Sequence, residues 1–200
     1  VNSNIESNFR KMRYSKLEEI RKRIKADFIL TAHHADDQVE TILMKILNSS
    51  GIEGLKGLRK LNQNIIRPMF NISKREISDY ASLNKVNFID DPTNCDDLFT
   101  RNFLRMNVIP QLKKLKNDIH IPFNNFTDRI DEVHDLITFN VENFCNSDSY
   151  ILRENAIEIS KSEFYTLPFL VQLRIISNLC LNAKNSFSKT DIRDCLLYTS

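Results

Sequence analysis

The chain has 200 residues, 42% of them hydrophobic, which suffices for one large domain or two small ones. Its formal net charge of +2 is too small to indicate a nucleic-acid partner by itself. No apolar run reaches the ~18 residues of a membrane span, and the opening segment is charged rather than signal-like. The four cysteines are far apart and form no C-x-x-C pair, which argues against a zinc ribbon, an iron–sulfur centre or a disulfide scaffold. We therefore expect a cytoplasmic protein that does not span a membrane.

The opening segment predicts a helix, because its apolar residues recur at helical spacing. These residues are Ile5, Phe9, Met12, Ile20 and Ile24. The same segment is rich in basic residues, among them Arg10 and Arg13, and a second basic group between residues 100 and 117 includes Lys113 and Lys114 without any acid. Both groups are compatible with binding to a phosphate backbone, and equally with solvated helix faces.

The next two elements bring charged side chains to the end of a strand. Residues 26–32 are apolar and bulky and predict a short buried strand, and residues 35–48 predict a helix from the spacing of their apolar positions. Between and just after them lies Thr31-Ala-His-His-Ala-Asp-Asp-Gln-Val-Glu-Thr41. In open α/β sheets, ligands bind at the carboxyl ends of strands. We therefore expect a binding site here.

Further alternation of helices and strands completes the first half of the chain. A loop with all three glycines (Gly51, Gly54, Gly57) precedes a short strand at Ile65-Ile66, which Pro68 ends. Ser73 to Glu76 is a capping-box pattern and predicts a helix to about Asn84, and residues 86–89 predict a third strand. This alternation indicates an α/β fold with a parallel sheet.

Beyond Pro110 the pattern becomes mainly helical. Apolar residues from Phe126 to Phe144 recur over five turns and predict a core-facing stripe, while residues 150–160 alternate weakly like a strand. Residues 169–181 and 190–198 predict two more helices. We place a domain boundary near residues 113–120, where Pro122 and a lysine-rich segment interrupt the periodicity.

The histidines and acids have several interpretations. His33 and His34 are adjacent at a strand end, so their side chains should point in different directions and only one should face a ligand. Asp36, Asp37 and Glu40 could complement the helix dipole, but three acids in five residues exceed that need and suit a cationic partner such as magnesium on ATP or an ammonium group. A dedicated zinc site is disfavoured, because adjacent positions on a strand do not converge on one metal ion.

Arg101 and Arg105 lie four residues apart, on one face if residues 99–108 are helical. One interpretation is salt bridging to the acids before them, which are Asp90, Asp91, Asp96 and Asp97. The other is stabilisation of negative charge on a phosphate or a leaving group, for which guanidinium donors are well suited.

Five motifs in order resemble the tRNA(Ile)-lysidine synthetase family of the N-type ATP pyrophosphatase superfamily. They are the E…R..RY pattern of Glu6, Arg10, Arg13 and Tyr14; TAHHADDQVET with the following SSGIEGLKGL; Arg67-Pro68 with KREI; DDPTNCDDLFTRNFLR at residues 90–105; and Val108-Ile-Pro-Gln-Leu112. The resemblance covers about the first 115 residues closely. Met106-Asn107 departs from the family pattern, where a histidine or a basic residue is expected.

The resemblance implies an adenine nucleotide alpha hydrolase-like fold. Residues 1–115 would be the C-terminal part of the catalytic domain, with a partial Rossmann-like parallel sheet, and residues 116–200 a truncated helical domain that binds tRNA or links domains. The implied enzyme is a cytoplasmic ligase that joins L-lysine to the wobble cytidine of tRNA(Ile) with a CAU anticodon, converting ATP with Mg²⁺ to AMP and pyrophosphate. The oligomeric state stays open, with a homodimer among the alternatives.

The resemblance also assigns roles to residues. Catalytic roles fall to Asp37, Glu40, Arg101 and Arg105, with Asp37 a candidate contact to Mg-ATP; substrate or ATP binding to His33, His34 and Asp36; and tRNA binding to Arg10, Arg13, Lys113 and Lys114.

One family motif is missing. The phosphate-binding Ser-Gly-Gly-x-Asp-Ser loop occurs nowhere in the 200 residues. We therefore expect a fragment of a longer protein that is inactive by itself, since nothing in it can hold the triphosphate. Two alternatives stay open: a non-catalytic tRNA-binding relative, and a sibling tRNA-modifying ATP pyrophosphatase such as a thiolase, which the missing cysteine pair disfavours.

Overall fold

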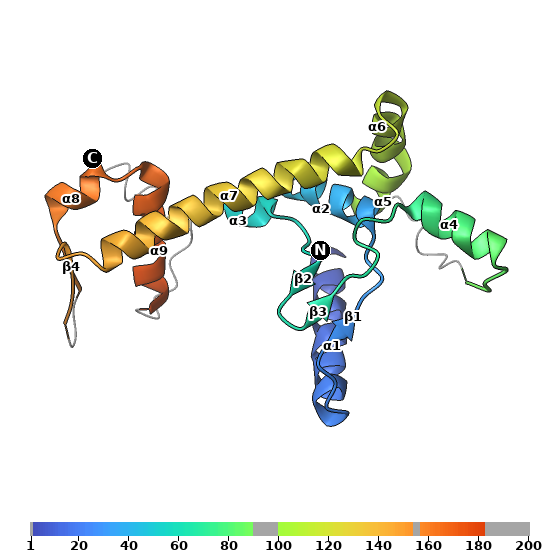
Figure 1. Ribbon diagram of the computed structural model, residues 1–200, viewed down its shortest axis with the longest axis horizontal. Coiled ribbons are helices and arrows are strands. Elements are labelled where there is room, and N and C mark those ends of the chain that lie inside the picture. The colour runs from blue at the N-terminus through green and yellow to red at the C-terminus, as the bar shows by residue number, and fades with distance from the viewer. Residues whose placement is uncertain (1, 90–99, 154–156, 183–200) are drawn as a thin grey trace. The chain divides into compact units, whose positions relative to one another are not determined.

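The computed structural model describes residues 2–89, 100–153 and 157–182 (Figure 1). Packing divides the chain into two compact units, Val1–Ile130 and Asp131–Ser200, which we describe separately. The predicted boundary between residues 115 and 116 stays a prediction, since a unit of packing and a domain defined by ancestry need not coincide.

The first unit opens with the predicted helix, α1 (Asn2–Arg23). Its last turn carries Arg21, Lys22 and Arg23, which complement the negative end of the helix dipole. Lys25 then adopts a left-handed conformation (φ 54°) and turns the chain toward the first strand.

A three-stranded sheet follows, in the order β1-β3-β2. The predicted strands β1 (Ile29–Leu30) and β3 (Ile65–Ile66) are confirmed and pair in parallel, with Ile29 opposite Ile65. The prediction that the first of them is buried is wrong for Leu30, which is 67% exposed, and right for Ile29. β2 (Leu61–Asn62) pairs antiparallel to β3, which the sequence did not predict. The sheet of the described residues is therefore mixed, within an α/β arrangement.

The predicted third strand at residues 86–89 is wrong. The segment forms no strand, and its apolar side chains are exposed, Ile89 to 96% and Phe88 to 66%. A run of apolar residues becomes a strand only where another strand accepts its backbone hydrogen bonds, and none among the described residues does so here.

Three helices come next to these strands in the order of the chain: two lie between β1 and β2, and one follows β3. α2 (Ala35–Leu47) is confirmed, and buries Ala35, Val39 and Ile42. The glycine-containing loop includes a short helix, α3 (Ile52–Leu55). α4 (Lys74–Leu83) begins with the predicted capping box: Ser73 Oγ accepts a hydrogen bond from the Glu76 amide at 3.2 Å, and Glu76 accepts one from the Ser73 amide at 2.8 Å.

The predicted helical character of residues 99–108 is confirmed for its described residues, which are all but Phe99. α5 (Thr100–Phe103) continues into a π-helical segment (Leu104–Val108) and then α6 (Ile109–Leu115). Pro110 has no amide proton for the usual helical bond, which favours the change of hydrogen-bond pattern before it. Ile109 packs with Val39 of α2 and with Ile119 in the core of the unit.

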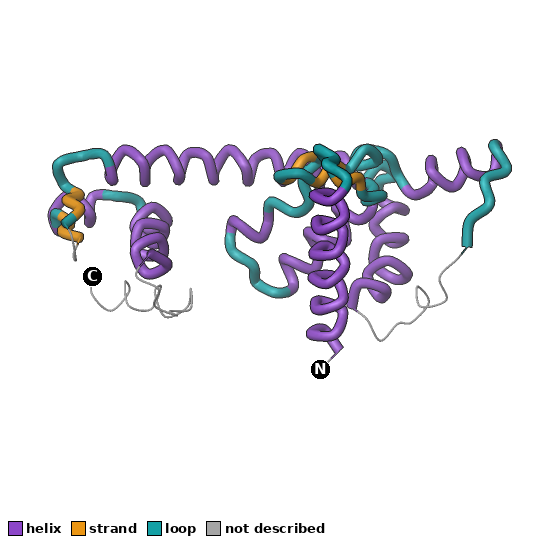
Figure 2. The backbone as a smooth tube through the Cα atoms, turned by 90° about the horizontal axis from the view of Figure 1, so that it is seen from below, coloured by secondary structure: helices purple, strands orange, loops and turns teal. Residues whose placement is uncertain are grey.

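The long helix α7 (His120–Cys145) passes from the first unit into the second (Figure 2). Its predicted apolar stripe is partly confirmed. Ile137, Val141 and Phe144 are buried, whereas Phe126 and Val133 are 38% and 41% exposed. The exposed part of the stripe corrects the prediction that the whole of it is core.

The second unit also contains a hairpin and two helices. β4 (Tyr150–Leu152) pairs antiparallel with β5 (Ile157–Ile159). The strand character predicted for residues 150–160 is confirmed, but the segment contains two paired strands, which the alternation did not predict. α8 (Lys161–Thr166) and the predicted helix α9 (Phe169–Asn182) follow. Phe164 packs edge-on against Phe144, with ring centroids 6.2 Å apart. The helix predicted at residues 190–198 lies outside the described residues.

Candidate functional site

The predicted site residues gather at the amino-terminal turn of α2, directly after the carboxyl end of β1. His34 is the N-cap, and its amide donates a hydrogen bond to Asp37 Oδ2 at 2.9 Å. This bond holds the Asp37 side chain over the start of the helix. Asp37 therefore has a local structural role at the start of the helix, as the interpretation through the helix dipole expected. This role does not explain why Glu40 is present.

Glu40 is the centre of an ion-pair cluster. Its carboxylate is 1% exposed and receives two hydrogen bonds from Arg105, from Nε at 2.7 Å and Nη2 at 2.9 Å. Arg101 Nε lies 3.3 Å from the second carboxylate oxygen. These bonds raise the pKa of Arg105, with the Glu40 hydrogen bonds as the largest cause. A carboxylate so buried and so fully paired fixes the position of both guanidinium groups.

Asp37 lies beside this cluster, with its side chain 15% exposed. Its Oδ1 is 3.6 Å from Arg105 Nη2, and its Oδ2 is 3.5 Å from His34 Nε2. Arg101 also donates a hydrogen bond to Thr41 Oγ1, at 3.2 Å. The four predicted catalytic residues are thus neighbours. The alternative partners proposed for the arginines, Asp90, Asp91, Asp96 and Asp97, lie outside the described residues.

Asp36 faces a different set of partners. It accepts a hydrogen bond from the Lys74 amide at 2.8 Å, and its other oxygen lies 2.7 Å from Lys113 Nζ. Burial alone would raise the pKa of Asp36, but the hydrogen bonds from Lys113 and Lys74 outweigh it and lower the pKa. Asp36 therefore connects α2 to the first residue of α4 and to α6. The predicted ATP binding by Asp36 and the predicted tRNA binding by Lys113 would each have to compete with the Asp36–Lys113 ion pair.

The two histidines have different partners, as their adjacency predicted. His33 Nδ1 lies 2.9 Å from Thr31 Oγ1, and burial lowers the pKa of His33, although the nearby Asp37 opposes this. A lowered pKa leaves the ring neutral near pH 7. His34 Nδ1 is buried without a hydrogen-bond partner among the described residues, while its Nε2 faces Asp37.

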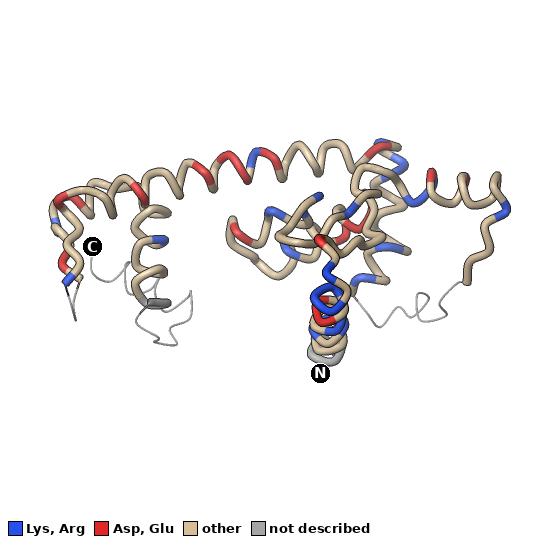
Figure 3. Tube along the Cα trace, turned by 60° about the horizontal axis from the view of Figure 1, so that its bottom comes forward, with Lys and Arg blue, Asp and Glu red and all other residues tan. Residues whose placement is uncertain are grey.

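The predicted tRNA-binding residues lie on two helices. Arg10 and Arg13 are exposed on α1, where their guanidinium carbons lie 5.7 and 5.9 Å from the Tyr14 ring centroid. Figure 3 shows that Lys and Arg positions recur along α1. Lys114 is exposed on α6 and donates a hydrogen bond to Gln111 at 3.0 Å. The charge of Arg10 also contributes to the lowered pKa of His33.

The sequence did not reveal the buried polar residue Gln38. It is 0% exposed and accepts a hydrogen bond from the Leu58 amide at 2.6 Å, which holds the glycine-containing loop against α2. Gly57 has φ +66°, and a Cβ there would lie 2.6 Å from Gln38 Oε1. Two features of the sequence could have indicated this contact: a glutamine on the apolar side of α2, and a glycine at position 57, where a side chain would collide with it. Arg67, also buried, donates to the Arg59 carbonyl at 2.6 Å.

In the described part of the chain, no three histidine, cysteine or acidic side chains converge as a metal site. Mg²⁺ on a nucleotide needs only one or two protein carboxylates, since phosphates and water complete its coordination. Asp37 could supply one such ligand.

No helix among the described residues is long and apolar enough to cross a membrane.

Comparison with known proteins identifies the family. The family described as the PP-loop domain matches residues 1–112. The chain is 33% identical to the tRNA(Ile)-lysidine synthase of Bacillus subtilis over 195 residues, covering 94% of this chain and 41% of that protein. It is 42% identical to the synthase of Borrelia garinii subsp. bavariensis over 111 residues, covering 56% and 25%, and 37% identical to that of Thermosipho africanus over 142 residues, covering 70% and 33%.

The chain spans between a quarter and about two fifths of the length of these curated relatives. The resemblance to tRNA(Ile)-lysidine synthetases is confirmed by their names, and the adenine nucleotide alpha hydrolase-like α/β fold by the family match. With more than half of its residues matched, the chain belongs to the PP-loop domain family.

Proposed function

We propose that this chain is part of a tRNA(Ile)-lysidine synthetase, which joins L-lysine to the wobble cytidine of tRNA(Ile) with a CAU anticodon. ATP adenylates the carbonyl oxygen of the cytosine and releases pyrophosphate. The lysine ε-amine then attacks the activated carbon and expels AMP. The observation that carries the proposal is the cluster of Asp37, Glu40, Arg101 and Arg105 in a chain whose named relatives are lysidine synthases.

Asp37 is the acid available to the lysine amine. Glu40 and Asp36 have both carboxylate oxygens engaged inside the protein, whereas Asp37 Oδ1 has only a 3.6 Å contact to Arg105. A carboxylate placed there binds the lysine ammonium. It also accepts the proton that the amine must lose before it can attack.

Glu40 acts through the arginines. It holds Arg101 and Arg105, whose side chains are 24% and 37% exposed, so the positions of both guanidinium groups are fixed. Fixed cationic donors stabilise the negative charge that collects on the phosphate and on the departing AMP. Glu40 is thus a positioning residue, and the two arginines are the groups that touch substrate.

His33 and His34 border the substrate pocket. The His33 ring is bonded to Thr31, and Nε2 of His34 lies beside Asp37. The lowered pKa of His33 favours a neutral imidazole, which can accept or donate a hydrogen bond to ATP or the cytosine. The cytosine enters unpaired, because a stacked base could not reach a pocket at the end of a strand. Arg10, Arg13 and Lys114 bind the RNA backbone.

The triphosphate requires a loop that the 200 residues do not contain. Among the described residues β1 is an edge strand that pairs only with β3, and its residue Leu30 is 67% exposed. We propose that a further parallel strand, followed by the phosphate-binding loop, pairs with β1. It would extend the sheet to a Rossmann-like one and place the loop beside His33. Mg²⁺ would accompany the ATP, with Asp37 as its contact to this chain. The protein would act in the cytoplasm.

Lysine incorporation tests the proposal. A protein that contains this chain together with the phosphate-binding loop should transfer radiolabelled lysine to tRNA(Ile) in the presence of ATP, and the 200-residue chain alone should not. The inactive control is Asp37→Ala, and the matched control is Asp79→Ala, an exposed acid on α4. Incorporation by the isolated chain would refute the need for the loop. Its absence in a protein that holds both ATP and tRNA would refute lysidine synthesis.

The second candidate is a non-catalytic tRNA-binding relative, which the missing loop favours. Such a protein would bind tRNA without ATP dependence, and neither Asp37→Ala nor Glu40→Gln would change its affinity for tRNA. Detection of lysidine in the product RNA excludes it.

A further inference from the structure

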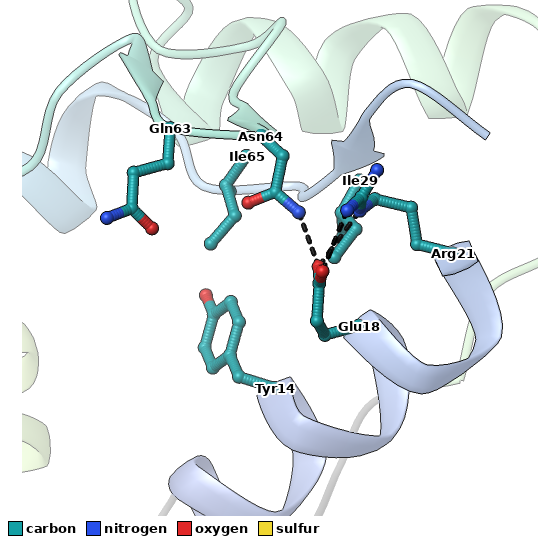
Figure 4. A pocket seen from close by; sticks show the side chains of 7 residues that line it. All are labelled: Tyr14, Glu18, Arg21, Ile29, Gln63, Asn64 and Ile65. Atoms are coloured by element: carbon teal, nitrogen blue, oxygen red, sulfur yellow. Dashed lines mark hydrogen bonds and ion pairs between the residues drawn. The ribbon is translucent and has the colours of Figure 1, made fainter. Parts of the chain in front are cut away.

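A pocket lies between α1 and the β2–β3 hairpin (Figure 4). Its volume is about 450 Å³, within the range of ~300–1,000 Å³ that small-molecule sites have. The lining residues are Tyr14, Glu18 and Arg21 of α1, Ile29 of β1, and Gln63, Asn64 and Ile65 of the hairpin. It is built from the sheet and α1, without any of the acids of α2.

The charged groups in this pocket neutralise one another. Glu18 accepts hydrogen bonds from Arg21 Nε at 2.9 Å and Nη2 at 2.8 Å, and a further one from Asn64. The Arg21 bonds are the largest cause that lowers the pKa of Glu18 to about 2. The pair therefore carries no net charge, and the pocket selects neither a cation nor an anion.

Two polar groups face the pocket without partners. Neither the hydroxyl of Tyr14 nor the side-chain amide of Gln63 is bonded to another group in the described part of the chain, and Figure 4 shows both at the open space. Gln63 has φ 52°, a left-handed conformation imposed by the hairpin turn. Ile65 and Ile29 are the apolar side chains that line the pocket, with Ile65 near Gln63 and Ile29 near Arg21 (Figure 4).

Two basic side chains lie next to the pocket residue Tyr14. Arg10 and Arg13 are exposed, and their guanidinium carbons lie 5.7 and 5.9 Å from the centroid of the Tyr14 ring. A neutral pocket beside two cationic side chains fits a neutral planar ring attached to an anionic backbone.

We propose that this pocket holds one unpaired nucleobase of the bound RNA, a nucleotide other than the one that enters the α2 site. Tyr14 and Gln63 form hydrogen bonds with the edge of the base, Ile65 and the Tyr14 ring contact its face, and Arg10 and Arg13 bind the adjoining phosphates. The choice of RNA rests on the proposed function. The site itself rests on the geometry of the pocket.

Direct binding tests this site. The probe is a fluorescently labelled oligouridine of six nucleotides, added to the 200-residue chain without ATP or lysine, and fluorescence anisotropy gives the affinity. Loss of one hydrogen bond in Tyr14→Phe should weaken binding about 3- to 10-fold. Tyr80→Phe, the same change at an exposed tyrosine of α4, should leave the affinity unchanged. Gln63→Gly removes the amide at a position whose positive φ glycine tolerates, and should weaken binding to a similar extent.

A second readout locates the RNA. An oligonucleotide with 4-thiouridine should crosslink to peptides that contain Tyr14 or Gln63. Crosslinks confined to other peptides, no binding at all, or wild-type affinity in both pocket variants would overturn the proposal. If UMP displaces the RNA at equal nucleotide concentration, the occupant is a free nucleotide, and the assignment to RNA is wrong. Because no reaction is followed, failure here leaves lysidine synthesis standing, and failure of lysidine synthesis leaves this binding result standing.

Discussion

The first two turns of α2 and the part of α1 around Tyr14 are both rich in charged and polar side chains, yet they differ in how these side chains are paired. On α2, Glu40 and Asp36 are buried, and each carboxylate is fully engaged by arginine, lysine or backbone donors. On α1, Arg10 and Arg13 are exposed, and the Tyr14 hydroxyl has no protein partner among the described residues. Charged groups whose hydrogen bonds are all made within the protein fix the geometry of the site. Groups without such bonds can form them with a ligand. Substitutions should therefore affect stability at the first region and binding at the second.

The largest effect on stability is expected for Glu40→Ala. It leaves Arg101 and Arg105 without their buried partner, and should lower the free energy of unfolding by about 2–4 kcal/mol, somewhat below the ~3–5 kcal/mol for fully buried pairs because the arginines are partly exposed. Urea unfolding measures this. Glu19→Ala breaks an exposed pair with Lys16 and should cost ~1 kcal/mol or less. Equal losses in the two variants would show that Glu40 is not the anchor described here.

Gly57→Ala should come next. The residue would keep an unfavourable positive φ, and its Cβ would meet Gln38 Oε1, so we expect a loss of about 1–3 kcal/mol in thermal unfolding. Gly51→Ala is the matched control, since no atom lies within 4 Å of its Cβ position, and should change stability by about 1 kcal/mol or less. A loss at Gly51 as large as that at Gly57 would contradict the contact with Gln38.

The Asp36–Lys113 pair should appear in the pH dependence of stability. The pKa of Asp36 is lowered in the folded state, so its contribution is present above the ordinary value of 3.8 and is lost as pH falls through the folded pKa. Wild type should be more stable than Asp36→Asn at pH 7, and the two should converge in acid. Chemical unfolding at a series of pH values measures the difference, and a constant difference down to pH 2 would contradict the ionic role.

The smallest effect is expected at His33. Burial lowers its pKa, and Asp37 partly opposes that shift. Proton NMR should show His33 titrating below the ordinary value of 6.5, and Asp37→Asn should move the midpoint lower still. A midpoint that rises in Asp37→Asn would mean that the two side chains do not interact as the structure indicates.

Much of the fold could be predicted because its signals are local. The spacing of Val39 and Ile42 predicted α2, and Ser73 with Glu76 predicted the start of α4. The strand β2 has only Leu61 and Asn62, which is too short to give an alternation. Residues 86–89 have the composition of a strand, but none of the described strands pairs with them, which no local pattern can reveal.

The sequence predicted which residues belong to the site better than it predicted which of them contact one another. Glu40 and Arg105 were both singled out, but their pairing across 65 positions was not, because the acids at residues 90–97 offered nearer partners. The separate role of Asp36 was also missed. Asp36 and Glu40 share a helix face, yet one turn of displacement brings them to different helices, and only the packing of α4 and α6 decides this.

The most direct test of the account is the dependence of lysidine formation on lysine concentration, in a protein that contains the phosphate-binding loop. Asp37→Asn removes the charge that we assign to the lysine ammonium, and should raise the KM for lysine about 10- to 100-fold while the affinity for tRNA(Ile) stays unchanged. An unchanged KM for lysine with a lowered affinity for tRNA would contradict it, and would place Asp37 at the RNA instead.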